Sequence, residues 1–335
     1  MRHTLEMPRS PRPLPPSLGA TFTQEEARAA GVTPRRLRAQ DIARPYRGLL
    51  RNEQLDKDAD GAADAEAELT REQSEYREIW ERAQEFAPLM VEHAFFVGRT
   101  AAKLRNLPVA ASGDLEVGVT APNRAPRRHG IKGRQLMPEL VSVREFGGVR
   151  VASPASTWAM LASELTAREL VVLGDAIVRV PRDERGDLHP ELALATVEQL
   201  RSAVDAGRRE GRALLRAGLE RIRVGSASPL ETEYRLDAED AGLPEPVLDL
   251  PIRNSSGRLL GITEIAYPEF RVLVEIEGDQ HRVSRQQWNR DIEKYAAYVA
   301  EEYEVVRLTS SHVRGKQPRA AEIVRTVLMR RNWRP

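Results

Sequence analysis

Two short apolar segments near the C-terminal end carry glutamates inside what we predict to be buried strands. The segments are Leu259–Ile265 and Arg271–Glu277, both rich in Ile, Leu and Val, and a turn at Tyr267-Pro268-Glu269 separates them. A carboxylate that is removed from water without a partner is very costly. The strands can therefore pack only in an arrangement that gives these glutamates a partner or leaves them in solvent.

The acidic residues of these segments are expected to lie close together. Glu275 and Glu277 share one face of the second strand, because successive side chains of a strand point to opposite faces. Glu264 lies on the neighbouring strand. Carboxylates gathered in this way need a cation, and Mg²⁺ or Mn²⁺ is the simplest candidate because such ions prefer oxygen ligands. The alternative is that these glutamates face solvent on a half-exposed antiparallel sheet.

The residues on either side of the two strands favour a functional site. Gly278-Asp279-Gln280-His281 is a glycine turn that leads to a histidine and then to a predicted helix. Ser228-Pro229-Leu230-Glu231 is a capping-box pattern with proline at the first helical position, so it opens a helix ahead of the strands. Glu231 can therefore act as a helix cap, as a residue near a metal ion, or as both.

The predicted order of these elements resembles the PD-(D/E)XK nuclease fold and, more narrowly, the very-short-patch-repair-like endonuclease domains. The resemblance covers Ser228–Thr309, and its most specific parts are Tyr267-Pro268 and Val274–His281. It implies an αβββαβ domain that hydrolyses DNA phosphodiester bonds with Mg²⁺ or Mn²⁺. The implied metal ligands are Glu264, Glu275 and Glu231, and the implied catalytic residues are Glu264, Glu275, Glu277, Gln280 and His281.

Two departures from that family leave other functions open. The first ligand of the family is usually aspartate, whereas Glu264 is one methylene longer, and Glu277 lies where many of these nucleases carry lysine. The nearest lysine, Lys294, is on the following predicted helix. An alternative is therefore an antitoxin-like DNA-binding transcriptional regulator whose nuclease-like domain has lost catalysis. A third is a protein–protein module for a toxin or a defence complex.

The N-terminal region contains a pattern typical of a winged helix-turn-helix. Thr23 can cap a helix over Gln24–Ala30, and a second helix is predicted from Thr33-Pro34 through Arg38, followed by a wing over Ile42–Arg51. The second helix would enter the major groove of DNA. The region resembles the start of AbiEi-type antitoxins, and the residues expected to bind DNA are Arg35, Arg36 and Arg38.

The middle of the chain also resembles the body of AbiEi-type proteins. We predict a strand over Leu115–Thr120, a hairpin of Val141–Phe146 with Val149–Ala152, and a helix opened by Ser153-Pro154. A basic cluster without any acid in it lies in a predicted Pro/Gly loop, and phosphate binding supplies most non-specific affinity for nucleic acid. The cluster consists of Arg124, Arg127, Arg128, Lys132 and Arg134.

The chain as a whole is predicted to be an α+β or α/β multidomain protein. The absence of cysteine excludes disulfides and zinc–thiolate sites. No apolar run approaches the ~20 residues that span a membrane, and the first residues lack the apolar core of a signal peptide, so we expect a cytoplasmic protein with DNA and a toxin or defence-system protein as partners. The expected parts are a disordered arm (1–20), the winged helix-turn-helix (21–51), an acidic linker and helix (52–85), the middle domain (86–190), a helical connector (191–226) and the nuclease-like domain (227–335).

Overall fold

The computed structural model describes residues 11–53, 70–278 and 285–335, and the chain divides into two compact units. Half of the predicted arm (1–10), part of the acidic linker, and Gln280 and His281 lie outside the described residues. The first unit contains the described parts of Met1–Thr100 together with Ala111–Leu136 and Val143–Val151. The second contains Ala101–Ala110, Met137–Ser142 and the described parts of Ala152–Pro335.

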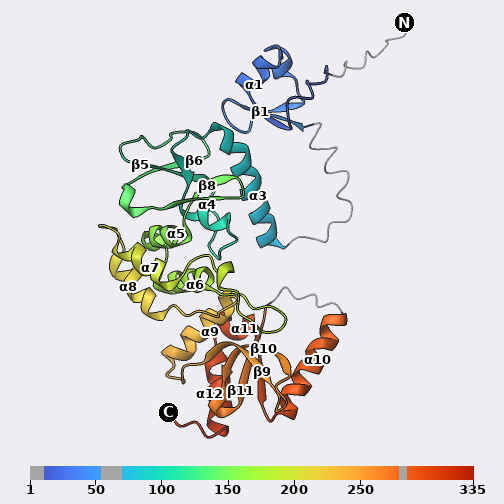
Figure 1. The fold of residues 1–335 in the computed structure, drawn as a ribbon, viewed down its shortest axis with the longest axis vertical. Helices are drawn as coiled ribbons and strands as arrows, with labels where there is room; N and C mark the ends of the chain where they lie inside the picture. Colours follow the sequence, from blue (N-terminus) through green and yellow to red (C-terminus); the bar gives the residue numbers. More distant parts are fainter. Residues whose placement is uncertain (1–10, 54–69, 279–284) are drawn as a thin grey trace. The chain divides into compact units, whose positions relative to one another are not determined.

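The first unit begins with a small antiparallel sheet in the order β1-β3-β2 (Figure 1). Its elements are β1 (Thr21–Thr23), α1 (Gln24–Ala29), the 3-10 turn η1 (Arg36–Arg38), β2 (Ile42–Ala43) and β3 (Leu49–Asn52). The side chains of Thr23 and Glu26 form a capping box at the start of α1, as the sequence predicts for Thr23. The predicted second helix is a single 3-10 turn, because the chain must turn back for Ile42 to pair with Asn52.

The rest of the first unit is built on a five-stranded sheet in the order β6-β5-β4-β8-β7. The predicted strand Leu115–Thr120 and the predicted hairpin are confirmed, while the strand Ile131–Leu136 replaces part of the predicted loop. The elements are α3 (Arg71–Phe86), η2 (Ala87–Leu89), β4 (Ala94–Phe96), α4 (Gly98–Lys103), β5 (Leu115–Thr120), β6 (Ile131–Leu136), β7 (Val143–Phe146) and β8 (Val149–Ala152); the last residues of α4 and β8 belong to the second unit.

Helices surround a tryptophan in the first part of the second unit. Trp158 is fully buried and donates a hydrogen bond from Nε1 to the carbonyl of Leu170 at 2.8 Å, which satisfies its polar atom inside an apolar core. Ser153 caps the helix that it was predicted to open. The elements are η3 (Pro138–Leu140), α5 (Pro154–Met160), η4 (Leu161–Ser163), α6 (Ala167–Val178), η5 (Pro190–Leu192), α7 (Val197–Asp205) and α8 (Arg212–Arg221).

The C-terminal part of the second unit has the predicted αβββαβ order, with two further helices. A four-stranded sheet in the order β12-β11-β10-β9 has antiparallel pairs on both sides of β10 and a parallel pair between β11 and β12. The elements are α9 (Pro229–Asp240), β9 (Val247–Arg253), β10 (Leu259–Tyr267), η6 (Pro268–Phe270), β11 (Val272–Glu277), α10 (Arg285–Ala300), β12 (Glu304–Thr309), α11 (Ser310–Arg314) and α12 (Ala320–Arg330).

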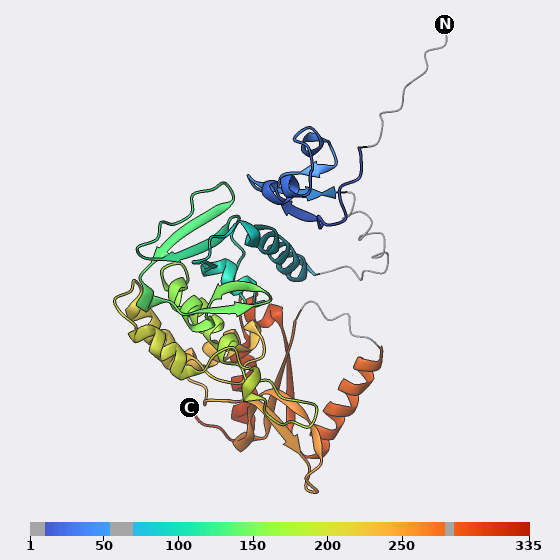
Figure 2. The same cartoon turned by 45° about the horizontal axis from the view of Figure 1, so that its top comes forward.

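The two faces of this sheet pack against different helices (Figures 1 and 2). Val274 and Ile276 belong to a core cluster that includes Tyr234 of α9 and Val324 of α12. On the opposite face, Leu273 packs in a second cluster with Tyr298 of α10. The alternation predicted for β11 is therefore confirmed, and Glu275 lies on the face that α10 covers.

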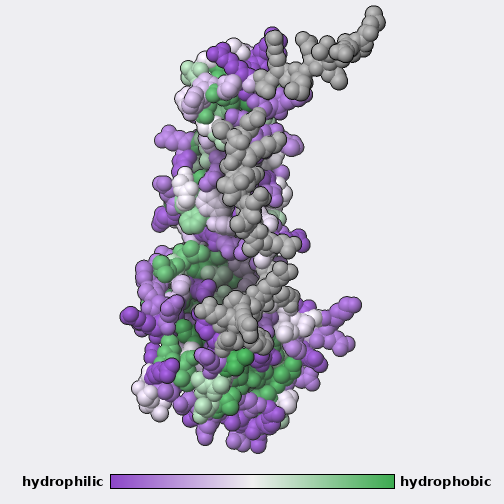
Figure 3. All heavy atoms as spheres, turned by 90° about the vertical axis from the view of Figure 1, so that its right-hand side faces the viewer, coloured by the Kyte–Doolittle hydropathy of each residue, from purple (hydrophilic) through white to green (hydrophobic). Residues whose placement is uncertain are grey.

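Apolar side chains also reach the surface of the second unit. Figure 3 shows hydrophobic surface gathered at the lower end of that view, and the exposed apolar residues of this unit include Ile292 and Val299 on α10, which are 53% and 62% exposed. Among the described residues, no helix combines the length and the apolar character needed to cross a bilayer.

Candidate metal site and nucleic-acid interface

Glu275 is a buried carboxylate with one satisfied and one unsatisfied oxygen. The residue is 5% exposed, and its Oε2 accepts a hydrogen bond from Lys294 Nζ at 2.8 Å. Its Oε1 is buried and has no hydrogen-bond partner within the described part of the chain. Buried polar atoms in native proteins almost always have a partner. The unpaired oxygen is therefore a candidate position for a ligand of positive charge.

Lys294 places a cation beside Glu275, whereas position 277 on the same strand is a glutamate. It comes from α10, and its Nζ also lies 3.5 Å from the carbonyl oxygen of Ile262 and over the ring faces of Tyr295 and Tyr298, at 5.3 and 5.7 Å from their centroids. Gly261 makes this approach possible, because a Cβ at that position would lie 3.0 Å from Lys294 Cγ and 2.5 Å from the Tyr298 hydroxyl. A lysine distant in sequence thus stands beside the acidic strand.

Glu264 lies where the β10–β11 ladder ends. The last pair is Ile265 with Val274, and Glu264 and Glu275 are at the next positions. The N–H of Ile276 donates to Glu264 Oε2 at 2.7 Å. Burial and the negative charge of Glu231 raise the pKa of Glu264 to about 8, with a smaller contribution from Glu275, and the Ile276 hydrogen bond and Lys294 oppose the rise. Glu264 is thus held near two other carboxylates.

Glu231 is 2% exposed and acts as a helix cap in a different way from the one predicted. Ser228 Oγ accepts from the Glu231 N–H at 3.2 Å, but the Glu231 carboxylate accepts from the N–H of Ala227 at 2.7 Å and not from that of Ser228. The reciprocal capping box is therefore incomplete, because the side chain reaches one residue further back. Burial raises the pKa of Glu231 to about 7, and the charge of Asp249 adds to this rise. Glu231 therefore caps the start of α9 and also belongs to the acidic group.

Asp249 is a member of this acidic group that the sequence reasoning missed. It lies on β9 between the pairs Leu248–Ile265 and Leu250–Thr263, across from Glu264. Its φ of 51° is unusual for a residue in a strand, and its Oδ2 accepts from Arg182 Nε at 2.7 Å. The signal that was available is an aspartate between two leucines in a predicted strand.

The acidic group fits a divalent cation in its chemistry. Carboxylates are the oxygen ligands that Mg²⁺ prefers, and two of them suffice because this ion keeps several waters. The unpaired oxygen of Glu275 is the observation that favours such a ligand. In the part of the chain that the structure describes, no three acidic or histidine side chains form a group that could hold a metal ion. Glu264 and Glu275 are therefore the pair to test.

Glu277 has a partner of its own at the surface of the sheet. It accepts a hydrogen bond from Arg307 Nε at 2.9 Å and a second from Nη2 of the same residue, and the Arg307 guanidinium lies 5.1 Å from the ring centroid of Tyr295. The structure therefore pairs this predicted catalytic residue with a cation from β12. Gln280 and His281, the other predicted catalytic residues, lie outside the described residues.

The arginines predicted to bind DNA in the first unit are not equivalent. Arg35 and Arg38 are exposed. Arg36 instead makes two hydrogen bonds to the carboxylate of Asp41, at 2.8 and 2.6 Å, and donates to the carbonyl of Arg12. An arginine held by both carboxylate oxygens has few donors left for phosphate. Arg36 is therefore a structural residue of this unit.

Two members of the second predicted basic cluster pair with an acid from outside the cluster. Glu116 of β5 is fully buried, and its oxygens lie 3.2 Å from Lys132 Nζ and 3.6 Å from Arg134 Nη2 on β6. The acid was not visible because it precedes the cluster in sequence and reaches it only when β5 and β6 pair. The remaining members differ: Arg128 donates to the carbonyl of Arg47, and Arg124 and Arg127 are exposed.

The raised pKa of Glu264 predicts how stability depends on pH. A carboxyl group whose pKa rises from 4.5 to about 8 on folding binds more protons in the folded state. The free energy of unfolding should therefore fall as pH rises through that interval, by at most about 1.4 kcal/mol per pH unit. The side chain introduced by Glu264→Gln cannot ionise. The free energy of unfolding of this variant, measured by denaturant titration, should therefore change less between pH 5 and 8.5 than that of the wild type. If the free energy of unfolding of Glu264→Gln depended on pH as steeply as that of the wild type, Glu264 would not be a buried titrating group. The control is Glu304→Gln, which removes an ion pair with Arg330.

Comparison of the chain with models of protein families gives no match. A search of curated proteins gives no match either. The resemblances stated above therefore stay predictions.

Proposed function

We propose that this protein binds DNA and hydrolyses its phosphodiester bonds with a divalent cation, in defence, repair or mobile-element biology. The observation that carries the proposal is the position of Glu264 and Glu275 on adjacent strands, just beyond the last pair of the β10–β11 ladder, with Lys294 Nζ 2.8 Å from Glu275. An αβββαβ unit that gathers carboxylates and a lysine in one place has the groups that phosphodiester hydrolysis requires.

The residues of the proposed site have separate roles. Glu264 and Glu275 would hold Mg²⁺ or Mn²⁺. Glu231 is close enough to Glu264 for its negative charge to raise the pKa of Glu264. When bound, such an ion lowers the pKa of a coordinated water and neutralises charge on the phosphate. Lys294 orients the Glu275 carboxylate through its hydrogen bond and places a second positive charge near the reacting phosphate. The rings of Tyr295 and Tyr298 hold the lysine in position.

A cleavage assay tests the proposal. Purified full-length protein is incubated with supercoiled plasmid, linear duplex and single-stranded DNA, with Mg²⁺, with Mn²⁺, or with EDTA. We expect nicks or breaks with either metal and none with EDTA. Absence of cleavage on all three substrates with both metals would reject the nuclease proposal.

One set of observations favours a second candidate, the antitoxin-like DNA-binding regulator. Glu275 already has a cation from Lys294, and Glu264 already accepts from the Ile276 N–H, so internal partners satisfy part of the acidic group. A domain of this kind can keep its fold without a metal ion. Specific DNA binding that is unchanged by EDTA, together with no cleavage, would select this candidate.

Both candidates predict that exposed arginines of the first unit contribute to duplex affinity. Arg35→Ala with Arg38→Ala should weaken binding about tenfold and reduce the dependence of binding on salt, because each lost phosphate contact lowers that slope by about 1. Arg36→Ala should instead lower the unfolding midpoint, because it leaves Asp41 without its bidentate partner. Fluorescence anisotropy over a salt series measures the first effect, and thermal unfolding the second. Affinity unaffected by the double change would point to a protein partner.

A further inference from the structure

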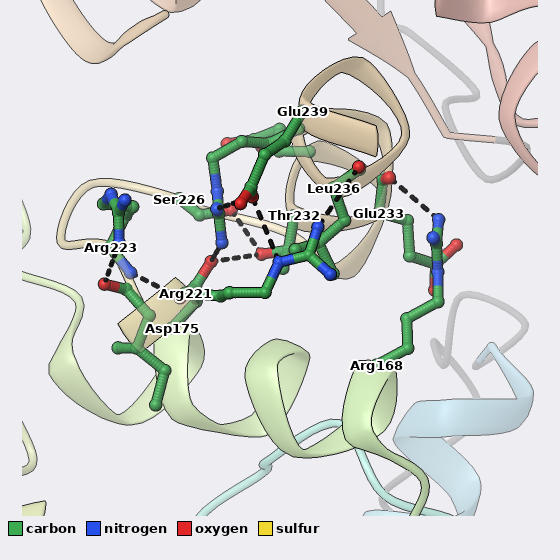
Figure 4. A network of polar contacts seen from close by, with 12 residues as sticks. Arg168, Asp175, Arg221, Arg223, Ser226, Thr232, Glu233, Leu236 and Glu239 are labelled. Atoms are coloured by element: carbon green, nitrogen blue, oxygen red, sulfur yellow. Dashed lines mark hydrogen bonds and ion pairs between the residues drawn. The ribbon is translucent and has the colours of Figure 1, made fainter. Parts of the chain in front are cut away.

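Side chains of α6 contact side chains and a backbone carbonyl of α9 in a polar network (Figure 4). Arg168 near the start of α6 donates to Asp237 Oδ1 at 2.7 Å and to the carbonyl of Glu233 at 2.8 Å. Two turns later, Asp175 accepts from Thr232 Oγ1 at 2.9 Å. Asp175 also accepts from Arg235 Nη2 at 2.8 Å, so Arg168 and Asp175 both contact α9 between Thr232 and Asp237. Asp175, in the last turn of α6, therefore lies beside Thr232, the residue that follows Glu231.

Arg179 is the residue that this arrangement delivers to the acidic group. It is the C-cap of α6 and follows Asp175 by four residues, so the two share a helix face. That face is directed at α9, whose first turn holds the buried Glu231. Arg179 itself is exposed. Within the described residues its guanidinium has no hydrogen-bond partner, unlike most arginines of this unit.

The segment after Arg179 fixes its position from the other side. Arg182 binds Asp249 of β9 with Nε 2.7 Å from Oδ2 and 3.0 Å from the carbonyl. Gly186, four residues further, has a φ of +85° and lies against Pro251, where a Cβ would be 3.4 Å from the proline ring. Arg179 thus lies in a short segment between Asp175, which contacts α9, and Arg182, which contacts β9. Burial raises the pKa of both Glu231 and Asp249, and the charge of Arg179 lowers both, which agrees with this placement.

We propose that Arg179 binds a backbone phosphate of the nucleic acid beside the acidic group. An acidic group alone repels a polyanion, so a site for DNA needs cations at its rim, and Lys294 is engaged with Glu275. Arginine presents planar paired donors that match the oxygens of a phosphate. Arg179 is exposed, and no described residue accepts a hydrogen bond from its guanidinium. This inference rests on the proposed function for the nature of the ligand, and it adds a binding residue from outside the αβββαβ domain.

The test measures binding separately from cleavage. Full-length wild type, Arg179→Ala and Arg179→Gln are titrated against a fluorescein-labelled duplex, with Ca²⁺ replacing Mg²⁺. The matched control is Arg201→Ala, because Arg201 is an exposed arginine of α7, a helix that packs against α5 and α8. Both Arg179 variants should bind the duplex about five- to tenfold more weakly. The slope of log K against log salt concentration should decrease in magnitude by about 1. Arg201→Ala should match the wild type.

The outcomes separate this inference from the nuclease proposal. If the wild type cuts DNA with Mg²⁺ but the Arg179 variants bind and cut as the wild type does, the nuclease stands and the role of Arg179 is wrong. If the wild type never cuts but the Arg179 variants lose affinity, the phosphate contact stands and catalysis is wrong. A wild type that does not bind the duplex at all overturns the inference. Thermal unfolding identifies a variant that fails to fold, and the remaining Arg179 variant then decides.

Discussion

Replacing Glu275 by glutamine is expected to reduce DNA cleavage by at least about 10²-fold while DNA binding changes little. The amide keeps the shape of the side chain but has no charge to hold a cation, and it cannot pair with Lys294 as the carboxylate does at 2.8 Å. A misplacement of ~1 Å at a reacting centre can itself cost ~10²-fold in rate. Initial cleavage rates at saturating Mg²⁺ and anisotropy titrations with Ca²⁺ measure the two effects separately.

The matched control for this change is Glu304→Gln. Glu304 is a glutamate of the same sheet that pairs with Arg330, so its replacement also removes one ion pair from this domain. The control should cut within about twofold of the wild type, since Glu304 pairs with Val272 at the start of the β11–β12 ladder, whereas Glu275 pairs further along with Arg307. Equal losses in the two variants would mean that Glu275 acts through stability alone.

Removing the charge of Lys294 should have an effect of similar size. Lys294→Met keeps an unbranched side chain beside Tyr295 and Tyr298 but leaves both Glu275 oxygens without a cation from the protein. We expect the turnover number to fall about 10²-fold, with a smaller change in apparent affinity for DNA. Lys294→Arg should recover part of the activity, because the longer group keeps the charge but not the geometry.

Lys316 provides the control for the lysine variants. It is exposed after α11, and Lys316→Met should leave turnover unchanged. Activity of Lys294→Met within about twofold of the wild type would show that the 2.8 Å contact stabilises the fold and has no part in hydrolysis. If Lys294→Met lowered the affinity for DNA but left the turnover number unchanged, Lys294 would contribute to DNA binding and not to the reaction at the phosphate.

Sequence patterns predicted the C-terminal fold well because its signals are local. Alternation placed Val274 and Ile276 on one face of β11 and Glu275 on the other, and the turns around Tyr267-Pro268 and Gly278 marked where the strand begins and ends. The same reasoning found the hairpin through Gly147-Gly148 in the first unit. In each of these cases the alternation of apolar residues and the turn residues beside it predicted the same strand.

The parts that sequence could not predict depend on contacts between distant segments. Lys294 reaches Glu275 because α10 crosses the sheet at Gly261, and Glu116 reaches Lys132 because β5 and β6 pair. Asp175 of α6 reaches Thr232 and Arg235 of α9 because these two helices pack together. Local pattern contains no information on such pairs. The single 3-10 turn at Arg36–Arg38 was missed for a related reason, since Asp41 and the pairing of β2 decide it.

The most direct test of the proposed site is the position of a bound Mn²⁺. Crystals of the wild type soaked in Mn²⁺ should give an anomalous difference peak at the carboxylates of Glu264 and Glu275, next to the Glu275 Oε1 atom, for which the described residues supply no hydrogen-bond partner. The same soak of Glu275→Gln crystals should give no peak there. A wild-type map without a peak between these carboxylates, at a Mn²⁺ concentration that supports cleavage, would contradict the assignment of the metal site.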